Sequence, residues 1–533
     1  MQKNFLQLWF QSVAILQKNQ TQITIIMNQA GKTKSFWDNH ISQENTAADN
    51  QKFDVIIIGA GITGITLANE LQQNGKKCLI IEKEHPGFGT TGRTTAHINN
   101  FFDSSYDEVI SNFGEKNAQV LGNAAKETVS YIKRNVQKYG IACEFAEVDF
   151  YLFSSEENQN KKLEDILEAH QKLGIETKPT QNIPFSIPFE KAIEISGQAQ
   201  FHPLKYLKGI LKKYEEKGGK ILNQTQVTEC KAENEVVTVK TSEGKTFEAT
   251  SVVWATHHAT GDSRFNLLVA PYRSYAMSVK LSGAPSKLAQ TADLEEPYHY
   301  LRYHKSGDNY YLIAGGFDHK TGEEPDTEKR FAELEKYVKD RIKFEHIENK
   351  WSAQYYVPAD GLPYIGKMPG EENIYLCTGF NGNGMTFGTM ASLIIPDLIN
   401  GNETDLAKML SPSRIKPVAS AKQVIKENVD TVSNLIKDRF NPDEISDLEQ
   451  IEKEEGKLAE VDGDACAVFR DKSGQLHFMD AKCTHMGCHV QWNPSEKSWD
   501  CPCHGSRFDA LGKVLIGPAL TDLEKINAEK ETR

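Results

Sequence analysis

The sequence contains no long hydrophobic run, and this absence excludes an ordinary membrane-spanning helix. Such a helix needs roughly 20 consecutive apolar residues. The nearest candidate, residues 390–399, is short and is interrupted by Pro396 and Asp397, so we expect it to form a core helix of a globular domain. No membrane span is therefore predicted.

The sequence also lacks an excess of positive charge. It has 61 Lys and Arg residues against 73 Asp and Glu residues, which gives a formal net charge of −12 at pH 7. Proteins whose main function is to bind nucleic acid or anionic membranes carry a basic patch or stripe. The acidic balance argues against both functions, and we predict no nucleic-acid partner.

Cysteine is scarce and unevenly distributed. Of nine cysteines, five are scattered (Cys78, Cys143, Cys230, Cys377 and Cys466) and four lie in the last tenth of the chain (Cys483, Cys488, Cys501 and Cys503). A secreted fold held together by disulfides shows a different pattern, with an even number of regularly spaced cysteines. The observed pattern is typical of a reducing compartment with one local metal site, so we predict a cytoplasmic protein.

Periodic apolar positions are few in residues 1–50, which are rich in Gln and Asn. A segment of this composition cannot bury enough apolar surface to fold, so we predict a disordered leader. Its apolar stretch is interrupted by Gln7, Gln11 and Ser12, and Lys3 is the only charge before it. These features argue against an export signal.

The regular part of the chain begins with a strand–turn–helix–strand pattern. With 533 residues the chain is too long for one core, so two or three domains are expected. A β-branched run at residues 55–58 precedes a glycine-rich turn, a helical pattern that continues to Leu71, and a second apolar strand at 78–81. This order predicts a βαβ unit. A β-hairpin is predicted further on, from residues 298–304 and 310–314.

The glycine-rich turn has the G-x-G-x-x-G spacing of a dinucleotide-binding site. Gly59 makes the tight turn, Gly61 lets the backbone approach a pyrophosphate, and Gly64 permits close packing of the helix on the strand. The N-terminus of the helix supplies positive potential. Glu82 follows the next strand and is placed to bind the hydroxyl pair of a ribose. The turn therefore predicts a bound dinucleotide.

Four residues near the C-terminus have the spacing of a metal site. Cys483 and His485 form a C-x-H pair, and Cys501 and His504 form a C-x-x-H pair after fifteen intervening residues. Two thiolates and two imidazoles are the ligands of a Rieske [2Fe–2S] centre, in which histidine nitrogens on one iron raise the potential. The same spacing fits a structural Cys₂His₂ zinc site, which is the alternative.

The residues beside these ligands favour the iron–sulfur interpretation. Cys488 and Cys503 each lie in one ligand loop and are placed to form a disulfide that joins the loops. Ser506 is placed to donate a hydrogen bond to a cluster sulfur. Residues 517–519 are placed to supply a third loop over the cluster.

The segments CTHMGC (483–488), CPCHGSRFD (501–509) and GPA (517–519) resemble the Rieske proteins of cytochrome bc-type complexes, over about the last 90 residues. The resemblance implies a [2Fe–2S] cluster in a small domain. Phe508 stands where that family usually has a tyrosine. The missing hydroxyl removes one hydrogen bond to the cluster environment, which implies a lower potential.

Four segments after the glycine-rich turn resemble the D-amino-acid-oxidase-like FAD superfamily, and they lie at residues 88–95, 253–256, 360–366 and 379–385. The resemblance extends over about residues 53–402 and implies FAD as the cofactor. Besides the glycine-rich turn and Glu82, it implies that FAD is bound by Thr91, Arg93, Thr94, Val227, Gly382, Gly384 and Met385. A helix that starts near Gly384 would point its positive end at the flavin pyrimidine and stabilise reduced flavin.

The whole chain resembles a bacterial group in which this flavoprotein domain is fused to a C-terminal Rieske domain. Features of that group match residues 298–302, 315–322 and 412–417, with Phe317 where Glu is common. The implied fold is an α/β FAD-binding Rossmann-type domain with an inserted α+β substrate domain, followed by a small all-β Rieske domain. The expected segments are the leader (1–50), the FAD-dependent domain (51–405), a linker (406–445) and the Rieske domain (446–533).

Two other patterns compete with this interpretation. Glu296, His299 and His304 imitate the two-histidine, one-carboxylate iron site of Rieske oxygenases. Strand residues five apart point to opposite faces, so we interpret the two histidines as ordinary strand residues.

His97 is a candidate for covalent flavin attachment. The histidine that serves this purpose in dimethylglycine-dehydrogenase-like proteins falls near Arg93, so we do not expect attachment here.

The candidates for catalysis are weaker than those for cofactor binding. Arg302 lies on a strand from which related oxidases present groups to the substrate. Asp318 and His319 follow two glycines at a strand end, where substrate loops often lie. An exposed polar turn is the alternative for both. His257 and His258 follow another strand, and we interpret them as part of a loop near the flavin.

The predicted function is that of an FAD-dependent dehydrogenase. A small organic substrate, such as an amine or amino acid, would reduce FAD, and the Rieske cluster would pass the electrons to an external acceptor protein. Two alternatives stay open. One is a reductase in which electrons flow from the cluster to the flavin, and the other is a non-catalytic electron-transfer or redox-sensing module.

Overall fold

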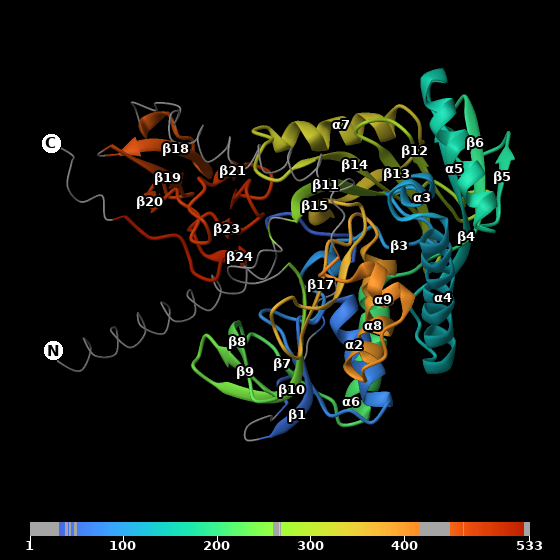
Figure 1. The fold of residues 1–533 in the computed structure, drawn as a ribbon. Helices are drawn as coiled ribbons and strands as arrows, with labels where there is room; N and C mark the ends of the chain where they lie inside the picture. The colour runs from blue at the N-terminus through green and yellow to red at the C-terminus, as the bar shows by residue number, and fades with distance from the viewer. Residues whose placement is uncertain are drawn as a thin grey trace, which may run out of the picture.

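The computed structural model describes residues 31–37, 41, 44–46, 51–258, 266, 268–414, 448–461 and 463–526. Most of the predicted leader and most of the predicted linker lie outside these residues. The described chain forms two large sheets, which belong to the first domain, and two small sheets near the C-terminus (Figure 1).

The first sheet contains the predicted βαβ unit. Its main strands have the order β16-β17-β10-β1-β2-β7, and all are parallel to their neighbours except β16. The hairpin of β8 and β9 extends the sheet from β10. The strands are β1 (Lys52–Ile58), β2 (Cys78–Ile81), β7 (Lys220–Leu222), β8 (Val227–Glu233), β9 (Val236–Thr241), β10 (Thr246–His257), β16 (Tyr364–Lys367) and β17 (Ile374–Thr378).

Three helices pack together against this sheet. Helix α2 (Ile62–Gln73) contacts both α6 (Pro203–Glu216) and α8 (Gly384–Ile399), and the three lie close together in Figure 1. The apolar residues of β1 are buried, as expected for a parallel strand covered on both faces. The buried residues of α8 include Met390 and Ile394, so the predicted core helix is part of α8.

The second sheet has nine strands in the order β15-β11-β14-β13-β12-β4-β6-β3, with β5 paired to β6. The predicted hairpin is the antiparallel pair β13–β14. The strands are β3 (His97–Ile98), β4 (Ala146–Ser154), β5 (Thr177–Thr180), β6 (Lys191–Gln200), β11 (Val269–Lys280), β12 (Ala289–Asp293), β13 (His299–Ser306), β14 (Asn309–Lys320) and β15 (His346–Pro358). This sheet and its helices form the inserted α+β region.

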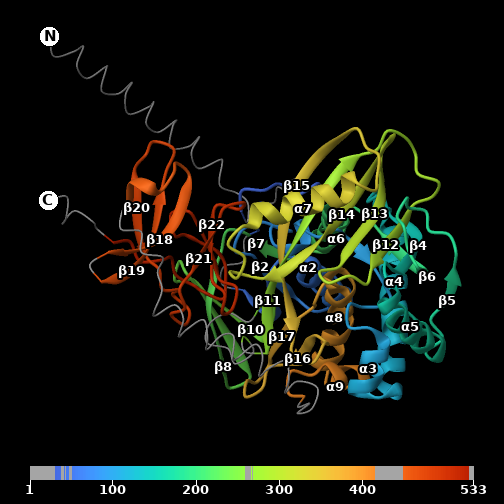
Figure 2. The same ribbon diagram turned by 90° about the horizontal axis from the view of Figure 1, so that it is seen from above.

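Of the remaining helices of the first domain, α5 and α7 pack on the second sheet, whereas α9 contacts α4 and β16 of the first sheet. In Figures 1 and 2, α3, α4 and α5 lie at the end of the molecule away from the C-terminal domain. The helices are α3 (Tyr106–Phe113), α4 (Glu115–Tyr139), α5 (Asn160–Lys172), α7 (Thr327–Lys339) and α9 (Asp405–Leu410), with short 3₁₀ turns η1 (Thr90–Gly92) and η2 (Glu157–Gln159).

The C-terminal domain consists of two small antiparallel sheets, which agrees with the predicted all-β fold. Its buried core includes Trp499 and Phe508. The strands are β18 (Glu455–Val461), β19 (Asp464–Arg470) and β20 (Leu476–Asp480) in one sheet, and β21 (Gln491–Asn493), β22 (Ser498–Asp500), β23 (Arg507–Asp509) and β24 (Val514–Ile516) in the other, with the 3₁₀ turn η4 (Leu448–Gln450) before them.

The C-terminal domain packs directly against the first domain, and both Figure 1 and Figure 2 show the two side by side. Lys83 Nζ donates a hydrogen bond to the carbonyl oxygen of Val514 at 2.9 Å. The Thr327 hydroxyl, at the start of α7, donates to Asn493 Oδ1 at 2.9 Å. The linker therefore joins two domains that are in contact.

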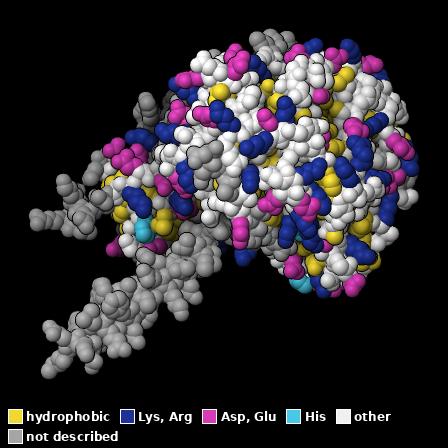
Figure 3. All heavy atoms as spheres, turned by 90° about the horizontal axis from the view of Figure 1, so that it is seen from below, with side chains coloured by type: hydrophobic (Ala, Val, Ile, Leu, Met, Phe, Trp, Pro, Cys, Tyr) yellow, Lys and Arg dark blue, Asp and Glu magenta, His cyan; other side chains and the backbone are white. Residues whose placement is uncertain are grey.

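The surface shows mixed charge. On the face seen in Figure 3, acidic and basic side chains are interspersed and do not gather by sign. Among the helices that the structure describes, none is long and apolar enough to cross a membrane.

Candidate active site and metal centre

A cavity lies at the carboxyl ends of β1 and β2, where open α/β sheets bind nucleotides. We call it the nucleotide cavity. Its walls include seven of the predicted cofactor residues, namely Gly59, Gly61, Glu82, Thr91, Val227, Gly384 and Met385. The structure thus brings together residues from five separate parts of the sequence.

The glycine-rich turn makes the close contacts that its spacing predicts. Gly59 has a φ of +106°, and the Glu82 carboxylate accepts hydrogen bonds from the N–H of Ala60 at 2.7 Å and of Glu84 at 2.9 Å. Burial raises the pKa of Glu82. Gly64 lies outside the cavity wall, and a Cβ atom there would lie 1.9 Å from the carbonyl oxygen of Gly59. The packing of α2 on β1 therefore requires glycine at this position.

A Gly64→Ala variant is expected to lose its FAD, because the added methyl group would collide with backbone and displace α2. We expect the flavin absorbance per chain after purification to fall to about a tenth of the wild-type value or less. Gly283→Ala is the matched control, since nothing lies within 4 Å of a Cβ atom there. A Gly64→Ala protein with its full complement of FAD would contradict the proposed packing.

A second cavity, of about 780 Å³, lies beside the first, and we call it the inner cavity. Thr90, His257, Gly384 and Met385 line both cavities and form a shared wall. Helix α8 begins at Gly384, as predicted, so the positive end of this 16-residue helix faces the shared wall. This wall is the expected position of the flavin ring, between the nucleotide on one side and a substrate on the other.

Three other predicted cofactor residues, Arg93, Thr94 and Gly382, line the inner cavity and not the nucleotide cavity. The N–H of Gly382 donates to Asp103 Oδ2 at 3.0 Å. The guanidinium group of Arg93 donates to the carbonyl oxygen of Ser352 at 2.9 Å and also takes part in the contact between the domains described below. This contact occupies a side chain that the resemblance had assigned to FAD.

Asp318 is a carboxylate of the inner cavity with a strongly perturbed pKa. The Tyr355 hydroxyl donates a hydrogen bond to Asp318 Oδ2 at 2.7 Å. Burial raises the pKa of Asp318 to about 7, because the charged form loses its water. This carboxyl group can therefore hold or release a proton near neutral pH.

The other two catalytic candidates lie outside both cavities. The Arg302 guanidinium stacks over the Trp37 ring at 5.2 Å, and His319 Nε2 lies 2.9 Å from the Tyr275 hydroxyl. His319 directly follows Asp318 in β14, so the two side chains point to opposite faces of the sheet. These positions argue against direct contact of Arg302 or His319 with a substrate.

Glu296, His299 and His304 do not come together as a mononuclear iron site. His299 Nδ1 lies 2.7 Å from Asp293 Oδ2, and His304 Nε2 lies 2.9 Å from Glu144 Oε2. The two histidines thus pair with different carboxylates on opposite sides of β13, as expected for strand residues five apart.

The four predicted cluster ligands meet between two loops, one after β20 and one after β22. The rings of His485 and His504 lie 5.0 Å apart. The Cys501 thiol donates a hydrogen bond to Cys483 and lowers the pKa of Cys483 to about 7. Neither ring nitrogen of the buried His504 has a hydrogen-bond partner among the described residues. A buried imidazole without partners is expected of a metal ligand, so these residues fit a [2Fe–2S] cluster.

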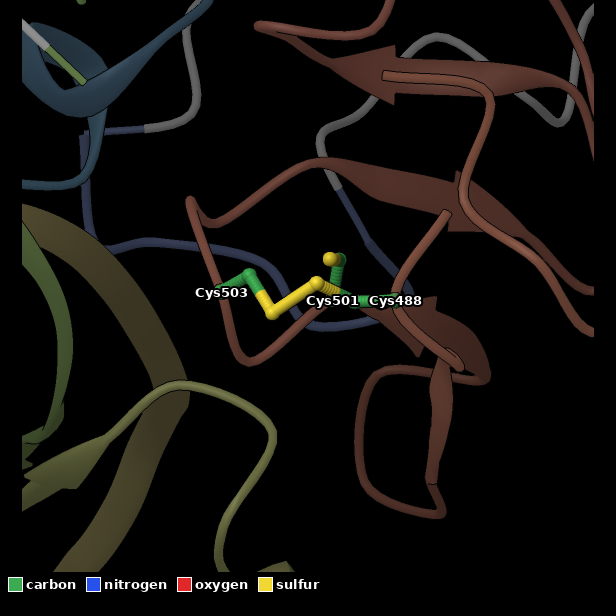
Figure 4. Close-up of side chains that lie close together, drawn as sticks. All are labelled: Cys488, Cys501 and Cys503. Carbon is green, nitrogen blue, oxygen red and sulfur yellow. A yellow bond between two sulfur atoms is a disulfide. The ribbon is translucent and has the colours of Figure 1, made fainter. Parts of the chain in front are cut away.

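A disulfide joins the two ligand loops. It links Cys488 to Cys503, as the sequence predicts, and Figure 4 shows Cys501 beside it. Ser506 forms a hydrogen bond with one of the ligand thiols and accepts another from the N–H of Ala519 at 3.0 Å. The third predicted loop is therefore tied to the ligand loops.

The C-terminal domain closes one side of the nucleotide cavity. Five of its residues are part of the cavity wall, namely Leu515, Ile516, Gly517, Ala519 and Leu520. A Cβ atom at Gly517 would lie 2.6 Å from the ring of His258, the residue after β10. The loop beside the cluster ligands therefore also contacts the FAD-binding side.

A short series of contacts joins a ligand loop to the shared wall. Gln354 Nε2 donates to the carbonyl oxygen of Gly505 at 2.9 Å and to the Tyr356 hydroxyl at 3.0 Å. The rings of Tyr356 and His257 lie 5.1 Å apart, and His257 is part of the shared wall. Sequence reasoning placed His257 near the flavin but missed Gln354 and Tyr356, which belong to no recognisable motif.

Buried charged side chains hold the two domains together. Arg93 and Arg273 of the first domain lie 3.5 Å and 3.8 Å from Glu496 of the C-terminal domain, and Arg273 lies 3.7 Å from Asp500. These four residues, which we call the charged dock, are each at most 8% exposed. Burial opposes ionisation of Asp500, but Arg507 and Arg273 hold its pKa at about 2. The dock leaves no motif in the sequence, because its partners are hundreds of residues apart.

Comparison with known proteins assigns both parts of the chain. The family model described as DAO, FAD dependent oxidoreductase, matches residues 54–398, and that of the Rieske [2Fe-2S] domain matches residues 443–527. YhfW of Bacillus subtilis, whose name assigns it to the Rieske 2Fe-2S iron–sulfur proteins, is 34% identical over 90% of this chain and 94% of its own length.

Two further similarities concern the first domain. The gamma-glutamylputrescine oxidoreductase of Escherichia coli is 23% identical over 66% of this chain and 84% of its own length. The crystal structure of glycine oxidase from Geobacillus kaustophilus matches 69% of this chain and 100% of its own, with a TM-score of 0.55 and 17% identity. At this identity the second similarity shows the fold alone.

Proposed function

Because this chain belongs to the FAD-dependent oxidoreductase family and carries a C-terminal Rieske [2Fe-2S] domain, we propose that it is a dehydrogenase of a small amine or amino acid. Its electrons would leave through the cluster to an external acceptor protein. FAD takes up two electrons from an organic substrate and can release them singly, which suits a one-electron partner. The observation that carries this proposal is the docking of the C-terminal domain on the nucleotide cavity.

The two cavities have different proposed functions: one binds the nucleotide and the other binds the substrate. Glu82 and the glycine-rich turn would hold the nucleotide, and the N-terminus of α8 would stabilise negative charge on the reduced flavin. The contacts from His257 to Gly505 support a direct electrical connection between flavin and cluster. The inner cavity supports substrate turnover, because a non-catalytic electron-transfer module needs no cavity of about 780 Å³ beside the flavin.

The compartment is also part of the proposal. The five scattered cysteines are thiols and not disulfides in the described structure, and the one disulfide lies beside the cluster ligands. A reducing cytoplasm accounts for both facts, since a disulfide packed beneath a cluster is shielded from thiol exchange.

An anaerobic screen tests the proposed function. Small amines and amino acids are added to the purified protein, and bleaching of the flavin absorbance is followed. We expect at least one compound to bleach the flavin, about two irons per chain, and a Rieske-type paramagnetic signal after reduction. Zinc in place of iron would overturn the cluster assignment. Reduction of the flavin only by a reduced donor protein would overturn the proposed direction of electron flow.

A further inference from the structure

We propose that the inner cavity selects a diamine or polyamine without a carboxylate group, and that Asp318 and the other carboxylates of the cavity recognise its ammonium groups. This inference rests on the proposed function and narrows its substrate class. It follows from the charge, the aromatic rings and the hydrogen-bonding groups of the cavity wall.

The wall of the inner cavity is strongly acidic. Two cationic side chains line it, and both are already paired: Arg93 lies 3.5 Å from Glu496, and Lys162 lies 2.8 Å from Asp107 and 2.7 Å from Glu108. Six carboxylates line the same cavity, namely Asp103, Glu108, Asp293, Glu295, Glu296 and Asp318, and only Glu108 among them is paired with one of these two cations. The balance of charge therefore favours a cationic ligand.

An amino acid fits this wall poorly. A substrate carboxylate is normally held by an arginine or lysine, most effectively by a bidentate guanidinium group. Arg302, which the sequence placed on the substrate side, lies outside the cavity over Trp37. A carboxylate in the cavity would instead meet Asp103 and Asp318 without a compensating cation.

Aromatic rings accompany the carboxylates. Tyr298, Tyr300 and Tyr355 line the cavity, and the rings of Tyr298 and Tyr300 lie 5.5 Å apart. The Tyr355 hydroxyl donates to Asp318. Electron-rich ring faces attract ammonium groups, and the attraction strengthens when water is excluded. The Asp318 carboxylate and the tyrosine rings together form a wall that favours a cationic nitrogen.

Two buried groups without partners provide evidence independent of the charges. Asn99 is 7% exposed and lines the cavity, and its Oδ1 atom has no hydrogen-bond partner among the described residues. The Nε2 atom of His97, another residue of the cavity wall, is also buried and has no hydrogen-bond partner among the described residues, and the Nδ1 atom of this ring lies 3.1 Å from the Thr95 hydroxyl. Burial lowers the pKa of His97 to about 3, so its ring is neutral. In the tautomer whose Nδ1–H donates to Thr95, Nε2 of His97 accepts an N–H hydrogen bond from an amine, as the amide oxygen of Asn99 does.

Three four-carbon compounds provide the sharpest test, because they differ only at one end. They are 1,4-diaminobutane, butylamine and 4-aminobutanoate. Each is titrated anaerobically into the FAD-loaded protein, and binding and reduction are read from the flavin spectrum. We expect 1,4-diaminobutane to act at a concentration lower than that of butylamine by about tenfold or more, and 4-aminobutanoate to be the weakest of the three.

Substitutions in the cavity wall test whether the preference for 1,4-diaminobutane arises in the inner cavity. Asp318→Asn and the more exposed Glu296→Gln should each weaken binding of 1,4-diaminobutane by about tenfold and that of butylamine less. Both should keep their FAD. Glu243→Gln, in the exposed turn before β10, is the matched control and should change nothing.

The pH dependence gives a second signature of Asp318. Aliphatic ammonium groups stay charged up to a pH of about 10, whereas Asp318 ionises near pH 7. Binding of 1,4-diaminobutane should therefore tighten as the pH rises through about 7, and Asp318→Asn should remove this change. The groups around Asp318 are Asp103, Ser274, His299, Tyr298, Tyr300 and Tyr355.

The possible failures are distinguishable. Equal action of butylamine and 1,4-diaminobutane, or stronger action of 4-aminobutanoate or glycine, would overturn the substrate class but leave the dehydrogenase function intact. A FAD-loaded protein whose flavin neither binds nor is reduced by any amine or amino acid would overturn both.

Discussion

A Cys501→Ser variant is expected to keep its FAD and its reduction by substrate while losing steady-state turnover with a one-electron acceptor. Cys501 is buried and its thiol contacts that of Cys483. A serine hydroxyl is a poor replacement for a thiolate on iron, so the cluster should not assemble. Cys501 lines neither cavity, so the change should leave the binding of FAD and substrate unaffected. We therefore expect turnover with cytochrome c as acceptor to fall by about tenfold or more.

Two measurements separate the half-reactions. Stopped-flow bleaching of the flavin by substrate reports the first, and cytochrome c reduction at saturating substrate reports the whole cycle. Cys466→Ser, a buried thiol on β19 of the same domain, is the control and should retain iron and turnover. Unchanged cytochrome c reduction by a Cys501→Ser protein that lacks iron would show that the electrons bypass the cluster.

The parts of the site that could be predicted from the sequence are those encoded by neighbouring residues. The turn at residues 59–64 and the two ligand pairs each lie in one loop, so their spacing reports their geometry directly. The disulfide joins residues adjacent to those ligands. The start of α8 at Gly384 was likewise visible as a glycine-rich turn followed by an apolar helix.

The inner cavity could not be predicted in this way, because strand register assembles it. Asp318 and Tyr355 come from β14 and β15, which are not neighbours in the sheet but are both paired with β11. Which of two consecutive residues faces the cavity depends on the strand's phase, and a shift of one residue exchanges them. For this reason Asp318 and His319 were indistinguishable in the sequence. Arg302 was assigned to the substrate side, and it lies outside both cavities.

The sequence also left open whether the C-terminal domain is docked or moves on its linker. The structure supports docking through buried charges. Glu496 accepts hydrogen bonds from the hydroxyls of Ser352 and Thr33 and lies near Arg93 and Arg273. Nearby arginines outweigh its burial and lower its pKa. A carboxylate with these partners stays ionised and holds the two surfaces in one arrangement.

A Glu496→Lys variant is expected to separate the two domains. It replaces a buried anion by a cation that faces Arg93 and Arg273. Leaving buried charges unpaired costs about 3–5 kcal/mol, so we expect the contact to open. The cluster ligands are unchanged, so iron should remain. The C-terminal domain closes one side of the nucleotide cavity, so the FAD content is measured as well and the rate is compared only in FAD-loaded protein. We expect a larger radius of gyration in small-angle X-ray scattering, and electron transfer from reduced flavin to the cluster that is slower by about tenfold or more.

The control for this variant keeps the change of charge but moves it off the contact. Glu452→Lys introduces the same substitution at an exposed position of the same domain, and it should leave both measurements unchanged. Glu496→Gln should have an intermediate effect, because an amide oxygen can still accept from Ser352 while the attraction to the arginines is lost. If Glu496→Lys leaves the scattering and the electron-transfer rate at their wild-type values, the dock does not position the cluster. If it releases the domain but the electron-transfer rate is unchanged, the contacts through Gln354 and Tyr356 are not the route between flavin and cluster.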